Sequence, residues 1–362
     1  MNKVMFIIND GVYPYHTGGM EVFNYHLIKS LSTEMPVSYI ASQEYDFDSA
    51  KYVRLSSLKP TKIFTPLWMF LYLMFHREFK RVVLSFSAAH WLVWRIYELA
   101  IRILRLKATV VIHYGKTVPQ DHFTIYSKFF RSAENVVAVS ADIKDNYDTA
   151  YGINCKVVYP MIPFVKEDKD SSCYRVKYHV PIDVNVISMV GSLKGMKNPQ
   201  RIIEALCLFD KEELTKYKPY VVYAGAGPMI EELKFLVESK GLSEYVSFLG
   251  LIPNSQIREV MTMTDVYLIA SDFEGTSVSL LEAMYNSKAI VASDVPGLRD
   301  MISNGENGLL YDVDSSAQLK ECIIKLLKSK PDAERLGKAA RYSYELKYDY
   351  GDVLNSYKNM LR

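Results

Sequence analysis

Cysteine is scarce in this sequence, with only four residues among 362. Cys155, Cys173, Cys207 and Cys322 are far apart and lack the short paired spacing of a zinc site or a small disulfide-rich domain. We therefore expect four free or buried thiols, and neither disulfides nor zinc.

The sequence also lacks a hydrophobic run long enough to cross a membrane. Its most apolar stretch, Thr65–His76, is shorter than the stretch of about 20 residues that a spanning helix needs. Met1-Asn-Lys-Val leads directly into an expected strand, without the apolar region and cleavage site of a secretory signal. We expect the protein to be cytoplasmic, within reach of the inner face of the cell membrane.

A strong net charge is absent as well, since the formal charge is only +2 at pH 7. The distribution is uneven: residues 1–131 contain 16 Lys and Arg against nine Asp and Glu, whereas the rest contains 27 against 32. The basic first part carries no recognised nucleic-acid-binding motif. We expect no nucleic-acid partner.

Aromatic, apolar and basic residues gather in two segments of this basic part. Thr65–His76 is followed by Arg77, Lys80 and Arg81. Helical spacing over Trp91–Lys107 aligns four charged residues on one stripe: Arg95, Glu98, Arg102 and Arg105. Basic and aromatic amphipathic helices suit peripheral contact with an anionic membrane. The alternative is that their apolar faces pack on a sheet, as in most such helices.

What the sequence does have is a regular succession of strands, turns and amphipathic helices. A chain of 362 residues with 49% hydrophobic content can bury two cores. Repeated strand, turn and helix units predict parallel sheets with right-handed crossovers. Pro163, the charged and serine-rich Lys166–Ser172, and Pro181 interrupt this pattern. We therefore expect an α/β protein with two domains, residues 1–165 and 166–350.

The most informative stretch joins a strand to a helix. Asp265–Ser271 is apolar and β-rich, as a buried parallel strand is, and Val278–Tyr285 has helical spacing. Glu274 would lie in the turn between them, and Glu282 would lie eight positions later on the helix. Free backbone N–H groups around Thr276–Ser279 would favour an anion such as diphosphate.

A second interpretation of this stretch is purely structural: Ser279 and Glu282 form a capping box, and Glu274 is an ordinary loop acid. The sequence that follows favours the functional interpretation. Lys288–Asp300 indicates another buried strand with a Pro-Gly turn, and Asn304–Tyr311 a glycine-rich connection. In this order of motifs, E-x7-E followed by a strand and a Pro/Gly turn, the sequence resembles the retaining GT-B glycosyltransferases of the large family 4.

The resemblance implies two Rossmann-like domains facing an interdomain cleft, with a last helix over residues 351–362 that crosses back to the first domain. It implies transfer of a sugar from a nucleoside-diphosphate sugar to an acceptor hydroxyl, with retained anomeric configuration. The acceptor would be a lipid-linked or polysaccharide intermediate of cell-surface glycan synthesis, as in lipopolysaccharide or capsule. Enzymes of this fold generally need no metal or other cofactor. Asp312-Val-Asp314, although similar to the metal-binding D-x-D of another fold, is therefore interpreted as an exposed acidic pair.

A further part of the resemblance lies in Gly191-Ser-Leu-Lys-Gly-Met-Lys-Asn-Pro199, after an expected strand. Lys197 falls on the family's lysine, which neutralises the donor diphosphate. Ser192, however, stands where the family has an arginine. Either Lys194 substitutes for this cation, or diphosphate binding is weaker, or another residue contributes.

Two glycine-rich turns also fall in the family's order. Gly18-Gly19 follows the first expected strand, and Gly225-Ala-Gly227-Pro228 follows a strand in the second half. Glycine permits positive φ and close backbone approach, so Gly19 would let amides meet the donor phosphates, although a plain tight turn is the alternative. The second turn lacks the third glycine and the downstream acid of a nicotinamide site.

Two histidines in the first half are further candidates. His113 ends the strand that begins at Thr109, where family members often place a histidine facing the reacting sugar. Ligands of open α/β sheets gather at the carboxyl ends of strands, but a structural histidine is the alternative. His16, before the glycine pair, would reach the acceptor side.

The resemblance assigns catalytic roles to Glu274, which positions the donor sugar, to Lys197, which stabilises the leaving diphosphate, and to His113 at the reacting centre. Donor contacts are expected from Gly19, Gly191, Lys194, Gly225, Gly275, Thr276, Ser277, Val278 and Glu282, the last of which binds the ribose. No general base is apparent, so the donor phosphate would accept the acceptor's proton. Two rivals remain: a GT-B sugar-nucleotide epimerase or hydrolase, and a non-catalytic partner subunit, for which Ser192 is the only hint.

Overall fold

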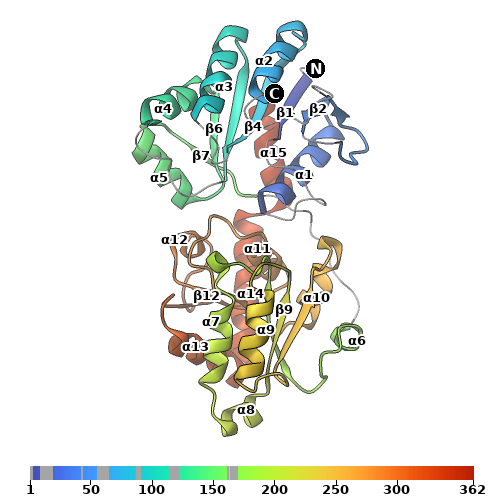
Figure 1. Ribbon diagram of the computed structural model, residues 1–362, viewed down its shortest axis with the longest axis vertical. Helices are drawn as coiled ribbons and strands as arrows, with labels where there is room; N and C mark the ends of the chain where they lie inside the picture. Colours follow the sequence, from blue (N-terminus) through green and yellow to red (C-terminus); the bar gives the residue numbers. More distant parts are fainter. Residues whose placement is uncertain are drawn as a thin grey trace. The chain divides into compact units, whose positions relative to one another are not determined.

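The computed structural model describes residues 3–8, 19–41, 44–54, 65–86, 91–113, 122–160, 163 and 170–362. It divides into two compact units, each built on its own sheet (Figure 1). The first unit contains Met1–Pro163 together with Asp349–Arg362, and the second contains Phe164–Tyr348. The chain therefore returns to the first unit with its last helix.

Parallel strands form the sheet of the first unit, in the order β3-β2-β1-β4-β5-β6-β7. Their bounds are β1 Lys3–Ile7, β2 Val37–Ile40, β3 Lys51–Tyr52, β4 Phe79–Phe86, β5 Lys107–Ile112, β6 Asn135–Ala138 and β7 Lys156–Val157. Every residue of β1 and β5 after the first is buried. Such near-continuous apolar runs are typical of central parallel strands that helices cover on both faces.

Helices flank this sheet and fill its core with aromatic side chains. Their bounds are α1 Gly19–Ser32, α2 Thr65–Phe75, α3 Trp91–Leu104, α4 Phe123–Ser132, α5 Ala141–Tyr151 and α15 Tyr350–Leu361. The ring of Trp94 on α3 is fully buried, 4.5 Å from the ring of Phe86 and 5.0 Å from that of Phe129 between centroids. The last helix, α15, packs on α1, where the rings of Tyr357 and Phe23 lie 5.7 Å apart.

The second unit has a parallel sheet in the order β10-β9-β8-β11-β12-β13. The strands are β8 Asn185–Val190, β9 Pro219–Ala224, β10 Val246–Gly250, β11 Val266–Ile269, β12 Ala289–Ser293 and β13 Leu309–Tyr311. The chain runs outward from β8 in one direction and, after β10, outward from β11 in the other. The sheet is therefore doubly wound, and its topological switch point lies between β8 and β11.

The helices of the second unit alternate with these strands (Figure 1). They are α6 Ser171–Lys177, α7 Gln200–Cys207, α8 Lys211–Tyr217, α9 Ile230–Ser239, α10 Ile257–Met263, α11 Val278–Tyr285, α12 Pro296–Arg299, α13 Ser316–Lys328 and α14 Lys330–Lys347, with 3-10 turns η2 Gly195–Lys197 and η3 Asn254–Gln256. Leucine, isoleucine and valine dominate their buried positions, so amphipathic helices close the core over both faces of the sheet.

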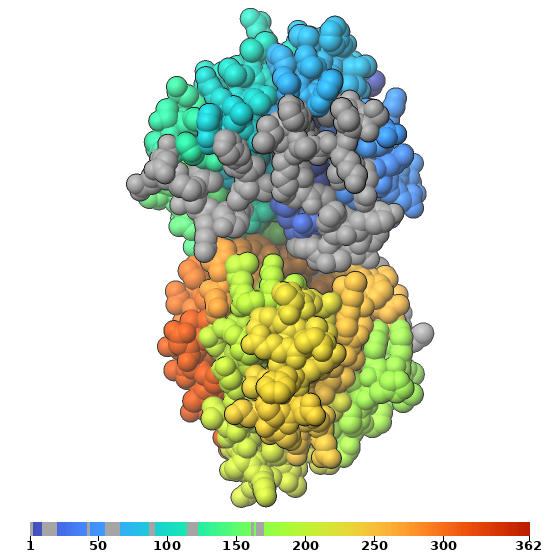
Figure 2. Space-filling view, viewed as in Figure 1, coloured from blue at the N-terminus to red at the C-terminus, as the bar shows by residue number. Residues whose placement is uncertain are grey.

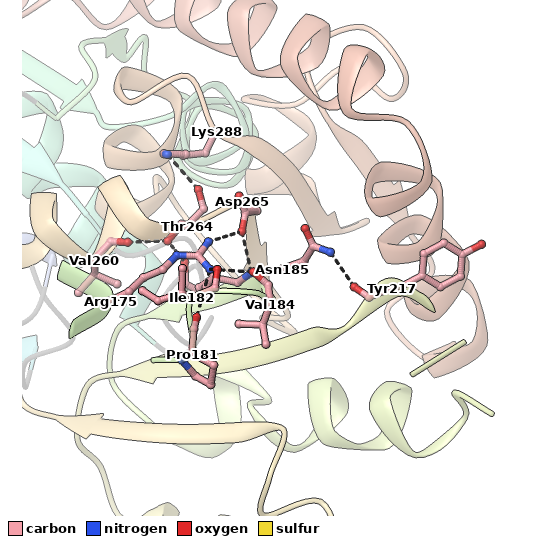
Figure 3. Close-up of polar contacts among 12 residues, drawn as sticks. Arg175, Pro181, Ile182, Val184, Asn185, Tyr217, Val260, Thr264, Asp265 and Lys288 are labelled. Carbon is pink, nitrogen blue, oxygen red and sulfur yellow. Dashed lines mark hydrogen bonds and ion pairs between the residues drawn. The ribbon is translucent and has the colours of Figure 1, made fainter. Parts of the chain in front are cut away.

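A buried arginine, Arg175, links the amino-terminal ends of β8 and β11 (Figure 3). Arg175 on α6 donates hydrogen bonds to the carbonyls of Pro181, Ile182 and Val184, at 3.3, 3.0 and 2.8 Å. It also pairs with Asp265, 3.0 Å away. The segment that leads into β8 is thereby held against the start of β11. This network lies at the opposite end of the strands from the loops where ligands of such sheets bind.

All four cysteines lie in the described part of the chain and are free thiols, as the sequence predicts. Within the same residues, no helix combines the length and the hydropathy that crossing a membrane requires.

Candidate functional site

Two loops meet at the switch point of the second unit. The first follows β8 and contains Gly191 and Lys197, and the second follows β11 and contains Glu274. Because β8 and β11 are neighbouring parallel strands, their carboxyl ends lie at the same edge of the sheet. The strand order therefore brings together two motifs that are far apart in the sequence.

The loop after β8 packs backbone to backbone on the loop after β9. A Cβ at Gly225 would clash with the carbonyl oxygen of Gly191, and one at Gly227 would clash with that of Leu193. The contact is held by the N–H of Gly191, which donates to Ala224 O at 3.0 Å, and by that of Leu193, which donates to the Ala226 carbonyl at 3.0 Å. The Gly-x-Gly turn thus packs directly against the Gly191 loop and fixes its position.

Lys197 ends the 3-10 turn η2, which is tied to the loop after β11. Asn198 adopts a left-handed conformation, with φ 47°, and its Nδ2 donates to Oδ1 of Asp272 at 2.8 Å. The N–H of Asp272 in turn donates to the carbonyl of Met196 at 3.0 Å. Two hydrogen bonds therefore hold the loops of β8 and β11 together, and they place Lys197 beside the second loop.

The carboxylate of Glu274 pairs with this lysine. Lys197 Nζ donates to Glu274 Oε1, and Ser271 Oγ donates to the same oxygen at 2.8 Å. Glu274 is only 8% exposed, so its charge is stabilised by the lysine and the hydroxyl instead of by water. Its backbone packs closely against Gly297, because a Cβ there would clash with the carbonyls of Glu274 and Gly275.

Ser277 directly precedes the helix α11. Its side chain accepts a hydrogen bond from the N–H of Leu280 at 3.3 Å, so it is the N-cap. The capping box of Ser279 and Glu282, the structural interpretation of this motif, is therefore wrong, because Ser279 already lies inside the helix. The N–H groups of Val278 and Ser279 belong to the first turn and have no carbonyl partner within the helix. They are available to an anion.

Glu282 is the second carboxyl group of the motif, and it is 7% exposed within α11. Burial raises its pKa to about 8. Within the described parts of the chain, no hydrogen bond or ion pair reaches its carboxyl group. Tyr267, whose Oη donates to Ser279 Oγ at 2.8 Å, has its pKa raised by burial and, further, by the charges of Glu282 and Glu274. A buried carboxyl group without a partner can form hydrogen bonds with a ligand.

Lys194 and Ser192 are both exposed on the loop after β8. Arg201, on α7, is a nearby cation that sequence reasoning missed. Its Nη1 donates to Oδ1 of Asp272 at 3.2 Å, and its Nη2 lies 3.8 Å from Oδ1 of Asp314. Asp314, the second acid of the D-x-D triplet, is thus an exposed partner of an arginine. Nowhere in the described residues do three His, Cys, Asp or Glu side chains form a group that could hold a metal.

The remaining candidates belong to the first unit. His113 follows β5 directly, and its ring lies 4.9 Å from that of Phe23 in an edge-on contact. The residue as a whole is half-buried, but its Nε2 is buried and has no hydrogen-bond partner in the described ranges. Burial lowers the pKa of His113 to about 3, so the imidazole is neutral at pH 7. Gly19 is the first residue of α1, and His16 and Gly18 lie outside the described residues.

Comparison with known proteins agrees with this geometry. Residues 172–343 match the family of glycosyl transferases group 1. This match covers most of the second unit and includes both loops of the candidate site. Over these residues the match agrees with the resemblance to glycosyltransferases that the sequence motifs indicate.

Two curated relatives of this glycosyltransferase type are each 30% identical to the chain. "Putative glycosyltransferase EpsD" of Bacillus subtilis aligns over 190 residues, which are 52% of this chain and 47% of that protein. A Campylobacter jejuni enzyme, named as an alpha-1,4-N-acetyl-D-galactosaminyltransferase of an undecaprenol-linked glycan, aligns over 136 residues, 37% and 36% of the two chains. The chain spans about half the length, or less, of these curated relatives.

The fold of the whole chain is similar to that of solved structures. The structure of Anabaena HepE in complex with UDP-glucose superposes with a TM-score of 0.80 over 99% of both chains, at 18% sequence identity. The two parallel-sheet, Rossmann-like units are those of the GT-B fold, as the sequence predicts.

Proposed function

We propose that the chain is a retaining glycosyltransferase of family 4, which transfers a sugar from a nucleoside-diphosphate sugar to an acceptor hydroxyl. One observation carries the proposal: the switch-point loops hold Lys197 against Glu274, next to a helix whose buried Glu282 has no side-chain partner in the described ranges. A cation, two carboxyl groups and free amides at one sheet edge suit a ligand that has both phosphates and hydroxyls.

The diphosphate of the donor would be bound by cations and amides. Lys197 is assigned to the leaving phosphate, and the exposed Lys194 supplies the charge that Ser192 lacks. Nothing lies within 4 Å of a Cβ position at Gly191, which leaves room for the phosphates, and Gly225 packs against the carbonyl of Gly191 and so supports that loop. The first-turn amides of α11, at the positive end of the helix dipole, are assigned to the same phosphates. In this proposal chain cations, without a metal, stabilise the charge that builds on the leaving group.

The two glutamates would form hydrogen bonds with the sugar and with the nucleoside. Glu274, with the backbone of Gly275, Thr276, Ser277 and Val278, is assigned to the hydroxyls of the transferred sugar, and Glu282 to the ribose. Donor binding would exchange the contact of Lys197 with Glu274 for contacts of each residue with the ligand. In the absence of donor, the hydrogen bonds among Lys197, Glu274 and Ser271 keep these side chains oriented for binding.

In the reaction, the bond between the anomeric carbon and the diphosphate oxygen breaks, and a bond to the acceptor oxygen forms on the same face. The acceptor's proton passes to the departing phosphate, so nucleoside diphosphate leaves. From the first unit we assign Gly19 to the phosphates, His113 to the reacting sugar and His16 to the acceptor. A neutral His113 can donate or accept a hydrogen bond without adding charge.

For the donor and acceptor, the named relatives supply the support. HepE is described in complex with UDP-glucose, and the Campylobacter jejuni relative is named for an undecaprenol-linked substrate. We therefore propose a UDP-sugar donor and a lipid-linked glycan acceptor in cell-surface glycan synthesis.

The test is release of nucleoside diphosphate from UDP-, GDP- and ADP-sugars, with and without a membrane lipid extract. Glu274→Ala and Lys197→Ala should abolish the extract-dependent release, whereas the exposed Glu238→Ala and Lys240→Ala serve as matched controls and should retain it. Release without the extract would indicate an epimerase or hydrolase instead. Absence of release from every donor would contradict the proposal and favour a non-catalytic subunit.

A further inference from the structure

The helix α2 contains no charged residue and exposes part of its apolar surface. Met69 and Leu73 are buried in the core of the first unit. Leu67, Leu71 and Phe75 repeat every four residues on another face, where Phe75 is 78% exposed. The large apolar side chains that α2 leaves exposed are Leu67, Trp68 and Phe75.

The neighbouring helix α3 continues this apolar surface. The two helices pack against each other, and Figure 2 shows their atoms next to one another, blue for α2 and cyan for α3. Leu92, Ile96, Leu99 and Ile103 follow helical spacing, and Ile103 is 61% exposed. We call the exposed and half-buried apolar side chains of both helices the α2–α3 face: Leu67, Trp68, Leu71, Phe75, Leu92, Ile96, Leu99 and Ile103.

Basic residues border this face. Arg77 and Lys80 are exposed just after α2, and Arg102 and Arg105 are exposed at the end of α3. The acidic residues in this part of the sequence are Glu78 and Glu98. Both already have cationic partners: Glu98 is buried between Arg95 and Arg102, and Glu78 pairs with Lys3. The border therefore has an excess of positive charge.

We propose that the α2–α3 face docks on an anionic membrane surface. Its leucine, isoleucine and aromatic side chains would enter the region between headgroups and acyl chains, and the basic border would contact anionic headgroups. Trp68 suits this position, because an indole prefers the boundary between apolar and polar surroundings. The proposal does not depend on the proposed function, since neither donor nor acceptor enters the argument.

The charge of the border argues against a second copy of the chain as the occupant. In a two-fold dimer through this face, the same surface patch of both subunits meets itself. The basic borders would then face each other, and like charges across an interface oppose association. An anionic lipid surface complements the same border.

Vesicle co-sedimentation of the full chain tests the proposal. Phosphatidylcholine vesicles are compared with vesicles that also contain phosphatidylglycerol, and the chain should partition more strongly onto the anionic ones. The double variant Phe75→Ser/Ile103→Ser should bind about tenfold more weakly, because two exposed apolar side chains no longer enter the lipid. Phe235→Ser/Leu346→Ser, which changes similarly exposed apolar side chains of the second unit, is the matched control and should bind as the wild type does.

The charged border is tested by Arg77→Gln/Lys80→Gln, which should weaken binding to the anionic vesicles about tenfold and leave binding to neutral vesicles unchanged. Unchanged circular dichroism melting curves establish that each variant is folded. Equal partitioning of the wild type and Phe75→Ser/Ile103→Ser would overturn the proposal. So would a dimer in sedimentation velocity that Phe75→Ser/Ile103→Ser dissociates, because a second copy would then cover the face.

Discussion

Lys197 and Glu274 form an ion pair although 77 positions separate them in the sequence. They meet because their loops follow β8 and β11, which are neighbours at the switch point of the second sheet. The pair joins two loops that the hydrogen bonds of Asn198 to Asp272 and of Asp272 to Met196 also hold together. It therefore links the stability of the second unit to the groups that we assign to donor binding.

Removal of the lysine should destabilise the second unit. Lys197→Met leaves the buried carboxylate of Glu274 with Ser271 as its hydrogen-bond donor, so we expect the free energy of unfolding to fall by about 1–3 kcal/mol. The double variant Lys197→Met/Glu274→Gln should lose less than the two single variants together, because no buried charge remains. Urea denaturation measures all three, with the exposed Lys240→Met as the control. Additive losses would contradict a direct coupling.

Ser271 should orient Glu274 without touching the donor. The hydroxyl is fully buried and donates to Glu274 Oε1, so Ser271→Ala should reduce kcat about fivefold to tenfold, as expected for one lost hydrogen bond. The proposal predicts little change in KM, and Ser271→Thr should restore part of the loss. Steady-state kinetics of nucleoside-diphosphate release provide the measurement, and Ser239→Ala, an exposed serine on α9, is the control. An effect on KM alone would show that Ser271 does not act through Glu274.

Local sequence patterns predict the strand β11, the helix α11 and the turn between them, because an apolar run and helical spacing are properties of neighbouring residues. The N-cap could not be predicted in the same way. Ser277 and Ser279 both suit an N-cap, and only the extended backbone of Ser277 decides between them. The bond of Asn198 to Asp272 was also missed, since it depends on which strands are neighbours. Both residues lie in loops that follow strands. A search for polar residues in the loops at the carboxyl ends of the predicted strands could have indicated that they meet.

Gly225 should tolerate no side chain. A Cβ would clash with the carbonyl oxygen of Gly191, and its φ of 157° lies in a region that favours glycine. We expect Gly225→Ala to lower the free energy of unfolding by about 3 kcal/mol. Gly195→Ala is the matched control, because nothing lies within 4 Å of its Cβ position, and it should be near neutral. Similar melting temperatures for the two variants would show that the loops can separate without cost.

The arginine at the other end of the strands should matter for stability alone. Arg175→Met removes the donor to three carbonyls and the partner of Asp265, and we expect a loss of about 3–5 kcal/mol. Arg299→Met, which breaks an exposed pair with Asp294, should cost less than about 1 kcal/mol. Denaturation curves give both values. Donor turnover per folded molecule should be unchanged in Arg175→Met, and a specific loss of turnover would contradict a purely structural role.

The buried Glu282 should make the second unit less stable as the pH rises. Its pKa is about 8 in the folded chain, against an ordinary value of 4.5, so between these values the folded state holds a proton that the unfolded state has released. The free energy of unfolding therefore falls as the pH increases through this window. Between pH 5.5 and 7.5 the contribution of this one group amounts to about 2–3 kcal/mol.

Comparison of the wild type with Glu282→Gln isolates this contribution. His113 and His26, whose pKa values burial lowers to about 3 and about 4, oppose the trend below pH 6.5, but they are present in both proteins and cancel. The difference in the free energy of unfolding between variant and wild type should grow with pH, and Glu238→Gln, on the surface of α9, should show no such growth. Parallel stability curves for wild type and Glu282→Gln would mean that Glu282 is ionised throughout. The folded chain would then bury a charged Glu282, and some other group would have to stabilise that charge. The assignment of Glu282 to a ribose hydroxyl would lose the support of a buried acid without a partner.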